Sequence, residues 1–581
     1  MTTALATASH VRPWVDNYPP GIKWGETIDT TPVHQQVLAA CARLGGAPAM
    51  DFLGKKTSYK ALGEAIVTMT GALQQKLGVK KGTRVALLLP NTPFYAIAYY
   101  AVLNAGGTVV NCNPLYTVPE LAHLVTNSGA DIVVTLDLTQ LFEKAEALCT
   151  AGHVKTVVVC HFPDALPLAK KVLYKLAKAG DLSKPDQSAI AGKIVHWNAL
   201  MTARAKPVAV EIDRHKDVAV QQYTGGTTGL PRGAMLSHAN IAANMSQIVN
   251  WGEDVFSPPN SVVAVLPFFH IFAMTVCLNV PLCRGIEVVM LPRFELKAFA
   301  DLVARTRATV LPAVPTLLHA LAHARTLEKE KLASITLVVS GGAPLHGETR
   351  AAFAKISPAL LAEGYGLTEA SPVVCCAALK VPSKPGSIGQ PLPGTDVRFV
   401  DVDTGAVLGL DQRGELQVKG PQVMLGYFED DTASKGAFAD GYLRTGDVGY
   451  VDADGYVFLV DRIKDLIICS GFNVYPRNIE EALETHPAVD EVSVIGVPDD
   501  YRGEAPVAFI KLREGQTATA AELKEFAGQH LSKIEMPREF IFKDELPKTL
   551  IGKLSKKELR EEYKSRKAKP SGSAQREQAT E

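Results

Sequence analysis

The sequence predicts an α/β protein with a large N-terminal domain of layered α/β subdomains plus a small β subdomain, and a small α+β C-terminal domain. Three observations lead to this prediction. The 581 residues exceed the length at which one hydrophobic core keeps growing. Between residues 60 and 450, helical periodicity alternates with short β-rich runs, which is typical of α/β layers. After Lys464 a second, compact pattern of strands and helices begins.

Short runs of β-branched and apolar residues predict the strands of the N-terminal domain, at 84–89, 131–135, 154–160 and 337–340. Within 400–460, glycines punctuate runs at 414–420 and 455–460, so a small β subdomain is expected there. In the C-terminal domain, strands are expected near 492–497 and 507–512, and helices near 477–485 and 520–531. We therefore predict domains at 1–463 and 464–563. The polar segment 564–581 lacks apolar periodicity and is predicted to be a disordered tail.

The composition excludes several classes of protein. Lys and Arg balance Asp and Glu at 60 each, so the protein has no overall positive charge that would favour binding of nucleic acid. The nine cysteines form no CxxC pair, and we interpret them as reduced core residues of a cytosolic protein. The N-terminus lacks a basic start before a long apolar stretch, and no run of about 18 apolar residues occurs. Neither a signal peptide nor a membrane-spanning helix is expected.

The strongest local signal is the segment 223–233, YTGGTTGLPRG. Its glycines and threonines offer backbone N–H groups and hydroxyl donors at close approach, which a polyphosphate requires. Arg232 can add a charge-assisted hydrogen bond to a phosphate. Neither the Walker pattern nor the dinucleotide fingerprint GxGxxG aligns with these residues, so a nucleotide must be held in another way.

Two further glycine-rich stretches accompany this loop. Residues 340–344 are predicted to be a strand end that turns tightly, and residues 364–369 place a hydroxyl and a carboxylate beside an aromatic ring. Glu369 is a candidate ligand for Mg²⁺, and Tyr365 can stack on a base. Taken singly, each stretch is more typical of an ordinary loop than of a nucleotide site.

Five motifs occur in a fixed order along the chain, at 223–233, 365–369, 442–449, 461–466 and 546–553. In these motifs and their order the chain resembles the acyl-adenylate-forming superfamily, which includes acyl-CoA synthetases, luciferases and the adenylation domains of peptide synthetases. The resemblance covers roughly residues 30–560. Segments 266–273 and 470–476 look most like those of bacterial medium- and long-chain fatty-acid CoA ligases.

The resemblance implies an ATP site formed by Thr224, Gly225, Gly226, Thr227, Thr228, Gly229, Arg232, Gly341, Gly342, Gly364, Tyr365, Gly366, Thr368, Asp447 and Arg462. In the roles it implies, residues 224–228 embrace the β- and γ-phosphates, Thr368 contacts the α-phosphate, and Asp447 binds the ribose hydroxyls with support from Arg462. The chain departs from the family at Arg232, where a lysine is usual. The planar, forked guanidinium group of arginine therefore replaces the compact ammonium charge of lysine. It departs again after Leu554, where the family usually has an arginine and this chain has Ser555 and Lys556.

The resemblance also implies four catalytic residues, namely Lys553, Glu369, Thr224 and His270, with Glu369 as the metal ligand. Lys553 would bridge the substrate carboxylate and the α-phosphate. The C-terminal domain would be mobile and rotate about Lys464, which would bring the coenzyme A path, Gly471, Phe472 and Asn473, to the same site. An acyl pocket is implied at Phe268, Phe269, His270 and Met274. Taken alone, His270 in the apolar stretch 263–280 is more typical of a core histidine, and only its position in the family pattern favours the acyl pocket.

Together these features predict ATP-dependent activation of a medium- or long-chain fatty acid to its acyl-adenylate, followed by transfer to coenzyme A. The substrates and cofactors implied are ATP, Mg²⁺, coenzyme A and the fatty acid. The segment 268–274 contains no aspartate, which argues against an amino-acid substrate. The alternatives within the superfamily are a fatty acyl-AMP ligase and an aryl-CoA ligase, and a lipid-binding or uptake protein without turnover is the alternative outside enzymes.

Residues 168–179, LAKKVLYKLAKA, place four lysines on one arc of a predicted helix and apolar residues on the other. Two interpretations stay open. The segment could be an interfacial helix that collects fatty acid at a membrane, or a surface helix packed on the core with solvated lysines. A cytoplasmic protein is expected, with peripheral membrane association and a homodimer as open hypotheses.

Overall fold

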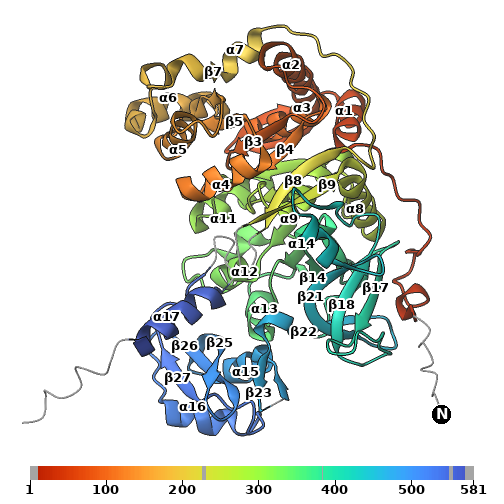
Figure 1. Cartoon of the computed structure of the whole chain (residues 1–581). Helices are drawn as coiled ribbons and strands as arrows, with labels where there is room; N and C mark the ends of the chain where they lie inside the picture. Colours follow the sequence, from red (N-terminus) through yellow and green to blue (C-terminus); the bar gives the residue numbers. More distant parts are fainter. Residues whose placement is uncertain (1–10, 225–230, 383, 471, 549–553, 569–581) are drawn as a thin grey trace, which may run out of the picture.

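The computed structural model describes residues 11–224, 231–382, 384–470, 472–548 and 554–568 (Figure 1). Within these residues, a nine-stranded sheet runs in the order β16 (Gln390–Pro391), β15 (Val373–Cys376), β14 (Leu360–Gly366), β13 (Leu337–Gly341), β12 (Val310–Ala313), β10 (Ser261–Ala264), β11 (Glu287–Met290), β1 (Pro48–Phe52) and β2 (Lys55–Ser58). The strands from β14 to β1 are parallel, and antiparallel strands close both edges.

A second sheet of eight strands contains β19 (Gly426–Tyr427), β9 (Arg232–Ser237), β8 (Val218–Thr224), β4 (Thr108–Asn111), β3 (Arg84–Leu88), β5 (Ile132–Leu136), β6 (Thr156–Cys160) and β7 (Ile194–His196). The helices of the two-sheet region are α1 (Val33–Leu44), α2 (Tyr59–Leu77), α3 (Pro93–Asn104), α4 (Val118–Ser128), α5 (Thr139–Thr150), α6 (Leu168–Ala177), α7 (Trp197–Thr202), α8 (His238–Trp251), α9 (Ile271–Ala273), α10 (Val280–Arg284), α11 (Leu296–Thr306), α12 (Pro315–Ala322) and α13 (Gly347–Ala354). One large core joins residues of both sheets.

Helix α3 illustrates how the two sheets are held together. Ten consecutive residues from 94 to 103 are buried, which is the pattern of a helix covered on all sides. The Thr92 side chain caps its first turn by accepting a hydrogen bond from the Tyr95 N–H. The buried Tyr95 hydroxyl donates to Asn111 at the end of β4 and approaches the Phe268 carbonyl oxygen at 2.9 Å. The helix therefore fixes the segment around residue 270 against the second sheet.

The small β subdomain consists of β17 (Asp396–Val400), β18 (Gly414–Lys419), β20 (Phe438–Ala439), β21 (Tyr442–Val451) and β22 (Val457–Arg462), with α14 (Asp431–Gly436) beside it. This confirms the glycine-punctuated strands predicted from the sequence. At Gly449 a Cβ would lie 2.2 Å from the Phe458 carbonyl oxygen, so β21 and β22 can approach each other only because this position lacks a side chain.

The C-terminal domain forms its own sheet from β23 (Ile467–Cys469), β24 (Phe472–Val474), β25 (Val489–Asp499), β26 (Gly503–Leu512) and β27 (Glu539–Phe542). Helices α15 (Pro476–Glu484), α16 (Ala520–Ala527) and α17 (Lys556–Ala568) cover it (Figure 1). Lys464 lies between β22 and β23, in the turn that joins two different sheets. The helix expected at 520–531 ends at Ala527.

Helix α17 corrects the predicted tail. The sequence placed the start of disorder at residue 564, but the helix continues to Ala568. Leu559 and Tyr563, four residues apart on one face, are buried in the C-terminal domain and hold the helix on the sheet. Residues 569–581 lie outside the described part of the chain.

All nine cysteines are free thiols, and eight of them are buried, as the sequence predicted. Burial raises the pKa of the Cys41 thiol to about 11 and that of Cys112 to about 12, so both are inert core groups. Within the described residues, no helix is long and apolar enough to cross a membrane.

Candidate functional site

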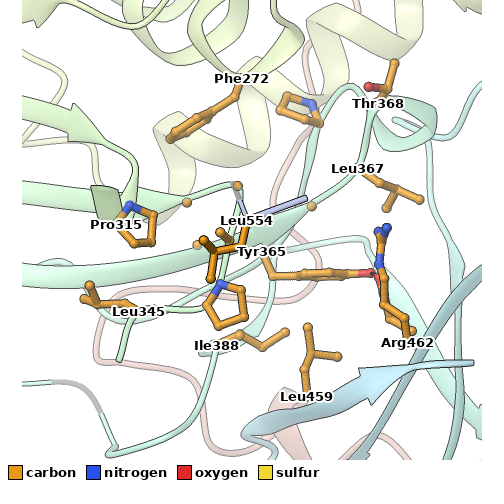
Figure 2. A pocket seen from close by; sticks show the side chains of 18 of the residues that line it. Phe272, Pro315, Leu345, Tyr365, Leu367, Thr368, Ile388, Leu459, Arg462 and Leu554 are labelled. Carbon is orange, nitrogen blue, oxygen red and sulfur yellow. Dashed lines mark hydrogen bonds and ion pairs between the residues drawn. The ribbon is translucent and has the colours of Figure 1, made fainter. Parts of the chain in front are cut away.

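A cavity of about 1540 Å³ lies between the carboxyl ends of the parallel strands of the nine-stranded sheet and the C-terminal domain (Figure 2). Its walls include the ends of β13 and β14, the β21–β22 pair, the turn Ile463–Asp465 and the start of α17. The carboxyl edge of an open α/β sheet is where ligands usually bind. Most of the residues predicted for the ATP site meet here.

Asp447 is the centre of a hydrogen-bonded trio. Its Oδ2 accepts from the Tyr365 hydroxyl at 2.5 Å, and its Oδ1 accepts from Arg462 Nε at 2.8 Å. Figure 2 shows the Tyr365 side chain pointing toward Arg462. A carboxylate offers about four acceptor positions, so two remain for other donors such as a pair of hydroxyls.

The sheet register fixes this trio. Asp447 and Arg462 are directly paired across β21 and β22, and Tyr365 comes from the end of β14. The field of the Asp447 carboxylate raises the pKa of the Arg462 guanidinium, which therefore stays a cation. Burial, together with the same carboxylate, raises the pKa of Tyr365 well above its usual value, so the phenol stays a donor. The site thus presents one anion whose hydrogen-bond partners hold its orientation.

Glycines give the cavity a smooth wall beside Tyr365. Gly341 pairs with Gly364 across β13 and β14, and a Cβ at Gly341 would lie 3.2 Å from the Phe272 ring. Gly342 follows with φ of 85°, a conformation that favours glycine. A Cβ at Gly366 would lie 2.0 Å from the Pro372 carbonyl oxygen. Gly342 is therefore required by its backbone conformation and Gly366 by space, whereas a Cβ at Gly364 would make only ordinary contacts, the nearest at 3.8 Å.

Glu369 and Thr368 follow Gly366 in a single 3-10 turn and line the same cavity. Glu369 Oε1 accepts a hydrogen bond of 2.8 Å from the Tyr427 hydroxyl, and the Glu369 carbonyl oxygen accepts from the Met424 N–H. The carboxylate is thus anchored by one neutral donor and can still offer oxygen to a hard cation, so it fits Mg²⁺.

The predicted phosphate loop connects two cavity-lining residues. Thr224 ends β8, Arg232 begins β9, and the two are paired across the strands. Arg232 Nε lies 3.2 Å from Asp430 Oδ2, and the Arg232 guanidinium lies over the Tyr427 ring at 5.7 Å. Gly225, Gly226, Thr227, Thr228 and Gly229 lie outside the described residues. Both ends of their loop nevertheless reach the cavity near Glu369.

The predicted acyl pocket is partly wrong in its details. Phe269 and His270 line the cavity, and His270 Nδ1 accepts a hydrogen bond of 3.3 Å from the Phe272 N–H. Phe268 and Met274 are fully buried and do not line it. Phe268 packs on the Tyr95 ring instead, with centroids 5.4 Å apart.

An apolar section of the cavity was not found by sequence reasoning. It is lined by Ile248, Trp251, Phe256, Val276 and Leu379. A Cβ at Gly252 would lie 2.5 Å from Leu379 and 3.7 Å from Phe256, so both side chains approach Gly252 closely. The Trp251 Nε1 donates to the Ala377 carbonyl oxygen at 2.9 Å, which leaves a purely apolar surface.

The C-terminal domain contributes the opposite wall. Leu554 lines the cavity (Figure 2), and its backbone pairs with that of Lys548, which also lines the cavity. Lys553 itself lies outside the described residues, as does Gly471. Lys464 lines the cavity from the turn Ile463–Asp465. Phe472 and Asn473 are exposed and do not line it in this arrangement of the domains.

Lys556, one of the departures from the family pattern, lines the cavity at the start of α17. Its Nζ lies 2.9 Å from Glu480 Oε1. Burial opposes its charge, but Glu480, Asp461 and Asp465 outweigh burial and raise the pKa of Lys556. The side chain therefore neutralises these three carboxylates beside the turn Ile463–Asp465.

Polar contacts join the two domains across the cavity. His346 Nδ1 lies 2.6 Å from Glu484 Oε2, and His319 Nε2 lies 3.7 Å from Asp490 Oδ1. Arg513 pairs with Glu348. Burial alone would lower the pKa of His346, but the Glu484 carboxylate outweighs it, and the net effect raises that pKa. The domains are thus held together here by charges rather than by a shared core.

The strand ends of a large α/β domain line one side of the cavity, and a small C-terminal domain lines the other. This arrangement is that of the AMP-binding enzymes. The family model for the AMP-binding enzyme matches residues 37–428, and the model for the AMP-binding enzyme C-terminal domain matches residues 478–553. The chain belongs to the AMP-binding enzyme family.

Individual relatives agree with this assignment. A long-chain-fatty-acid--CoA ligase of Bacillus subtilis is 38% identical over 95% of this chain and 98% of its own length. A 4-coumarate--CoA ligase of Oryza sativa is 33% identical over 92% of this chain and 93% of its own. The crystal structure of ATP-bound MatB from Rhodopseudomonas palustris is similar with a TM-score of 0.79 and 31% identity, over 92% of this chain and 99% of the other.

Proposed function

We propose that this chain is an ATP-dependent ligase that joins a medium- or long-chain fatty acid to coenzyme A. The observation that carries the proposal is one continuous cavity that has a polar and an apolar section. The Asp447 trio and Glu369 supply hydrogen-bond acceptors and a metal ligand in the polar section. Trp251 and Phe256 supply a surface without charge in the apolar section. Names of relatives that act on long-chain fatty acids support the same substrate.

In the first step, the fatty-acid carboxylate oxygen attacks the α-phosphorus of ATP, the bond to the β-phosphate oxygen breaks, and pyrophosphate leaves. Two anions meet, so catalysis consists of charge neutralisation and alignment. Asp447 would accept the ribose hydroxyls, and Tyr365 would face the adenine. Lys553 would lie between the two reacting anions, and Arg232 would bind the departing phosphates. Mg²⁺, held by Glu369, would supply further positive charge.

In the second step, the thiol sulfur of coenzyme A attacks the acyl carbon, the bond to the AMP oxygen breaks, and AMP leaves with the electron pair. The thiol proton passes to solvent or to a nearby base. Rotation of the C-terminal domain about Lys464 would remove Lys553 and bring Phe472 and Asn473 to the cavity. Closure in each step excludes water, which would hydrolyse the adenylate. We expect the reaction to take place in the cytoplasm.

Pyrophosphate release across saturated acids from acetate to stearate, with and without coenzyme A, tests the proposal. We expect the highest kcat/KM with medium or long chains and thioester formation only with coenzyme A. Benzoate and coumarate serve as the aryl substrates. A higher kcat/KM with coumarate would favour an aryl-CoA ligase, and adenylate without thioester would favour an acyl-AMP ligase. No turnover with any acid would favour a binding protein.

Gly252 offers a prediction about chain length. A Cβ there would lie 2.5 Å from Leu379 Cδ1 and would push this side chain into the apolar section. We therefore expect Gly252→Ala to lower kcat/KM for stearate relative to octanoate by about tenfold. Gly46→Ala, where a Cβ meets nothing within 4 Å, is the matched control. An unchanged preference would show that acyl chains do not reach Leu379.

A further inference from the structure

Helix α6 is attached to the protein by its polar side. Lys170 Nζ donates to the Leu53 carbonyl oxygen at 2.8 Å, and Lys171 Nζ lies 2.7 Å from Asp164 Oδ1. Between these two lysines on the helix surface lies Tyr174, whose ring packs on Phe162 with centroids 5.2 Å apart. These are the positions by which the helix faces the fold.

The opposite side of α6 is apolar and faces water. Leu168 is 78% exposed, Val172 52%, Leu173 64% and Leu176 80%, and α6 has no buried residue. At about 100° per residue, Leu168, Val172 and Leu176 fall within one narrow arc, roughly opposite Tyr174. This contradicts the interpretation of a core-packed helix with solvated lysines, because Lys170 and Lys171 meet the protein and the apolar side chains do not.

Single exposed apolar residues are common on protein surfaces, but a contiguous set on one face is not. For comparison, Ile479 and Leu483 of α15 are buried against the C-terminal sheet, as amphipathic surface helices require. Figure 1 shows α6 at an outer edge of the N-terminal domain, well away from the C-terminal domain. Its apolar face is therefore available to a partner outside this chain.

The charges of the segment indicate which partner. Lys175 and Lys178 are exposed, and Lys175 borders the apolar arc beside Leu168. The helix contains no acidic residue. A second copy of α6 would bring like charges together, whereas anionic lipid headgroups would neutralise them while the leucines enter the acyl region.

We infer that α6 docks this protein on an anionic lipid surface, with Leu168, Val172, Leu173 and Leu176 inserted at the boundary between headgroups and acyl chains. Docking itself does not depend on the catalysed reaction. The advantage of docking for catalysis does rest on the proposed function, because a long-chain fatty acid partitions into a lipid surface and the docked enzyme would take its substrate from there. Lys175 and Lys178 then contact headgroup phosphates at the edge of the helix.

Co-sedimentation of the full chain with vesicles of equal phosphatidylglycerol and phosphatidylcholine tests this inference, with phosphatidylcholine alone for comparison. We expect binding to the anionic vesicles, reduced about tenfold or more by Leu173→Gln with Leu176→Gln. Lys175→Glu with Lys178→Glu should abolish the preference for anionic lipid. The control is Val402→Gln with Leu410→Gln, two exposed apolar residues of the β subdomain. Circular dichroism checks that each variant is folded.

Binding that α6 changes do not alter, or no binding by the unmodified chain, would overturn the inference. A dimer that dissociates in the leucine variant, seen by light scattering without lipid, would also overturn it in favour of a second copy. Pyrophosphate release with water-soluble octanoate should be unchanged in the leucine variant. If the unmodified chain fails that assay, the proposed function is wrong, but the vesicle result still decides whether α6 docks.

Discussion

The two walls of the cavity are built in different ways. On the N-terminal side, Tyr365, Asp447 and Arg462 come from paired strands and hold one another at 2.5 and 2.8 Å. On the C-terminal side, the contacts across the cavity are charge pairs such as His346 with Glu484. The first wall is set by the register of two sheets. The second is a docked surface.

This difference indicates which wall can move. The cores of the C-terminal domain contain only residues after 466, whereas the large core joins both N-terminal sheets. Among the described residues, undocking the small domain therefore exposes no shared core, and the charge pairs that it breaks can be replaced by water at modest cost. We expect the N-terminal wall to keep its geometry through both half-reactions while the C-terminal wall is exchanged.

The largest effect is expected at Lys553, the residue of the C-terminal domain that we propose lies between the two reacting anions. Lys553→Ala should lower pyrophosphate release by about 100-fold or more. Thioester formation from pre-made acyl-adenylate should continue, because that step no longer joins two anions. The exposed Lys533→Ala is the matched control in the same domain. Equal loss of both half-reactions would show that Lys553 does not distinguish them.

The second prediction concerns the pivot between the walls. Lys464→Pro fixes φ near −65° and removes a backbone donor, which hinders the conformer that needs another φ. Pyrophosphate release should persist while transfer to coenzyme A falls by orders of magnitude. Lys464→Ala removes the ammonium group and keeps the backbone free, so it separates the side chain from the hinge. Parallel loss of both steps in the folded proline variant would make Lys464 an ordinary site residue.

A change on the fixed wall should affect nucleotide binding in both half-reactions. Asp447→Asn removes the anion that pairs with Arg462 and Tyr365. The lost charge-assisted bonds should weaken ATP and acyl-adenylate binding by about tenfold to hundredfold, measured by calorimetric titration. Asp440→Asn, an exposed aspartate of the same subdomain, is the control. Unchanged affinity would exclude a ribose contact at Asp447.

The smallest effect is expected at the docking contact. The pKa of His346 is raised in the docked arrangement, so its imidazolium is fully present below about 6.5 and is lost as pH rises through the raised value. Burial also raises the pKa of the Glu484 carboxyl, so on the acid side the pair is lost as that carboxyl protonates. Pyrophosphate release should therefore decline at alkaline pH, and His346→Gln should reduce this dependence by about two- to threefold. The exposed His215→Gln is the control. An identical pH profile in both variants would show that docking does not limit the first step.

The sequence predicted the strands well where β-branched runs are short and flanked by glycines, as in β18 and β22. It also identified Tyr365, Asp447 and Arg462, because they lie in ordered motifs. It could not separate Phe268 from Phe269, since the pattern is apolar on both sides. Nor could it find Trp251, because α8 is buried over most of its surface and its sequence gives no sign of which face borders a cavity.

Helix α6 shows a different limit. Its periodicity predicts an amphipathic helix, but periodicity does not say which face meets the protein. That orientation depends on Asp164, Leu53 and Phe162, which belong to other segments of the chain. The contacts between the domains are missed for the same reason, because His346 and Glu484 are far apart in sequence.

The separate cores also have a consequence for thermal unfolding. The clusters around Val494 and Phe509 lie wholly within the small domain, and none of the described residues joins them to the N-terminal core. Heating should therefore produce two cooperative transitions in a differential scan, one for each folding unit. A ligand that binds across the cavity would bring the two transitions together, because it stabilises both units only while they are docked.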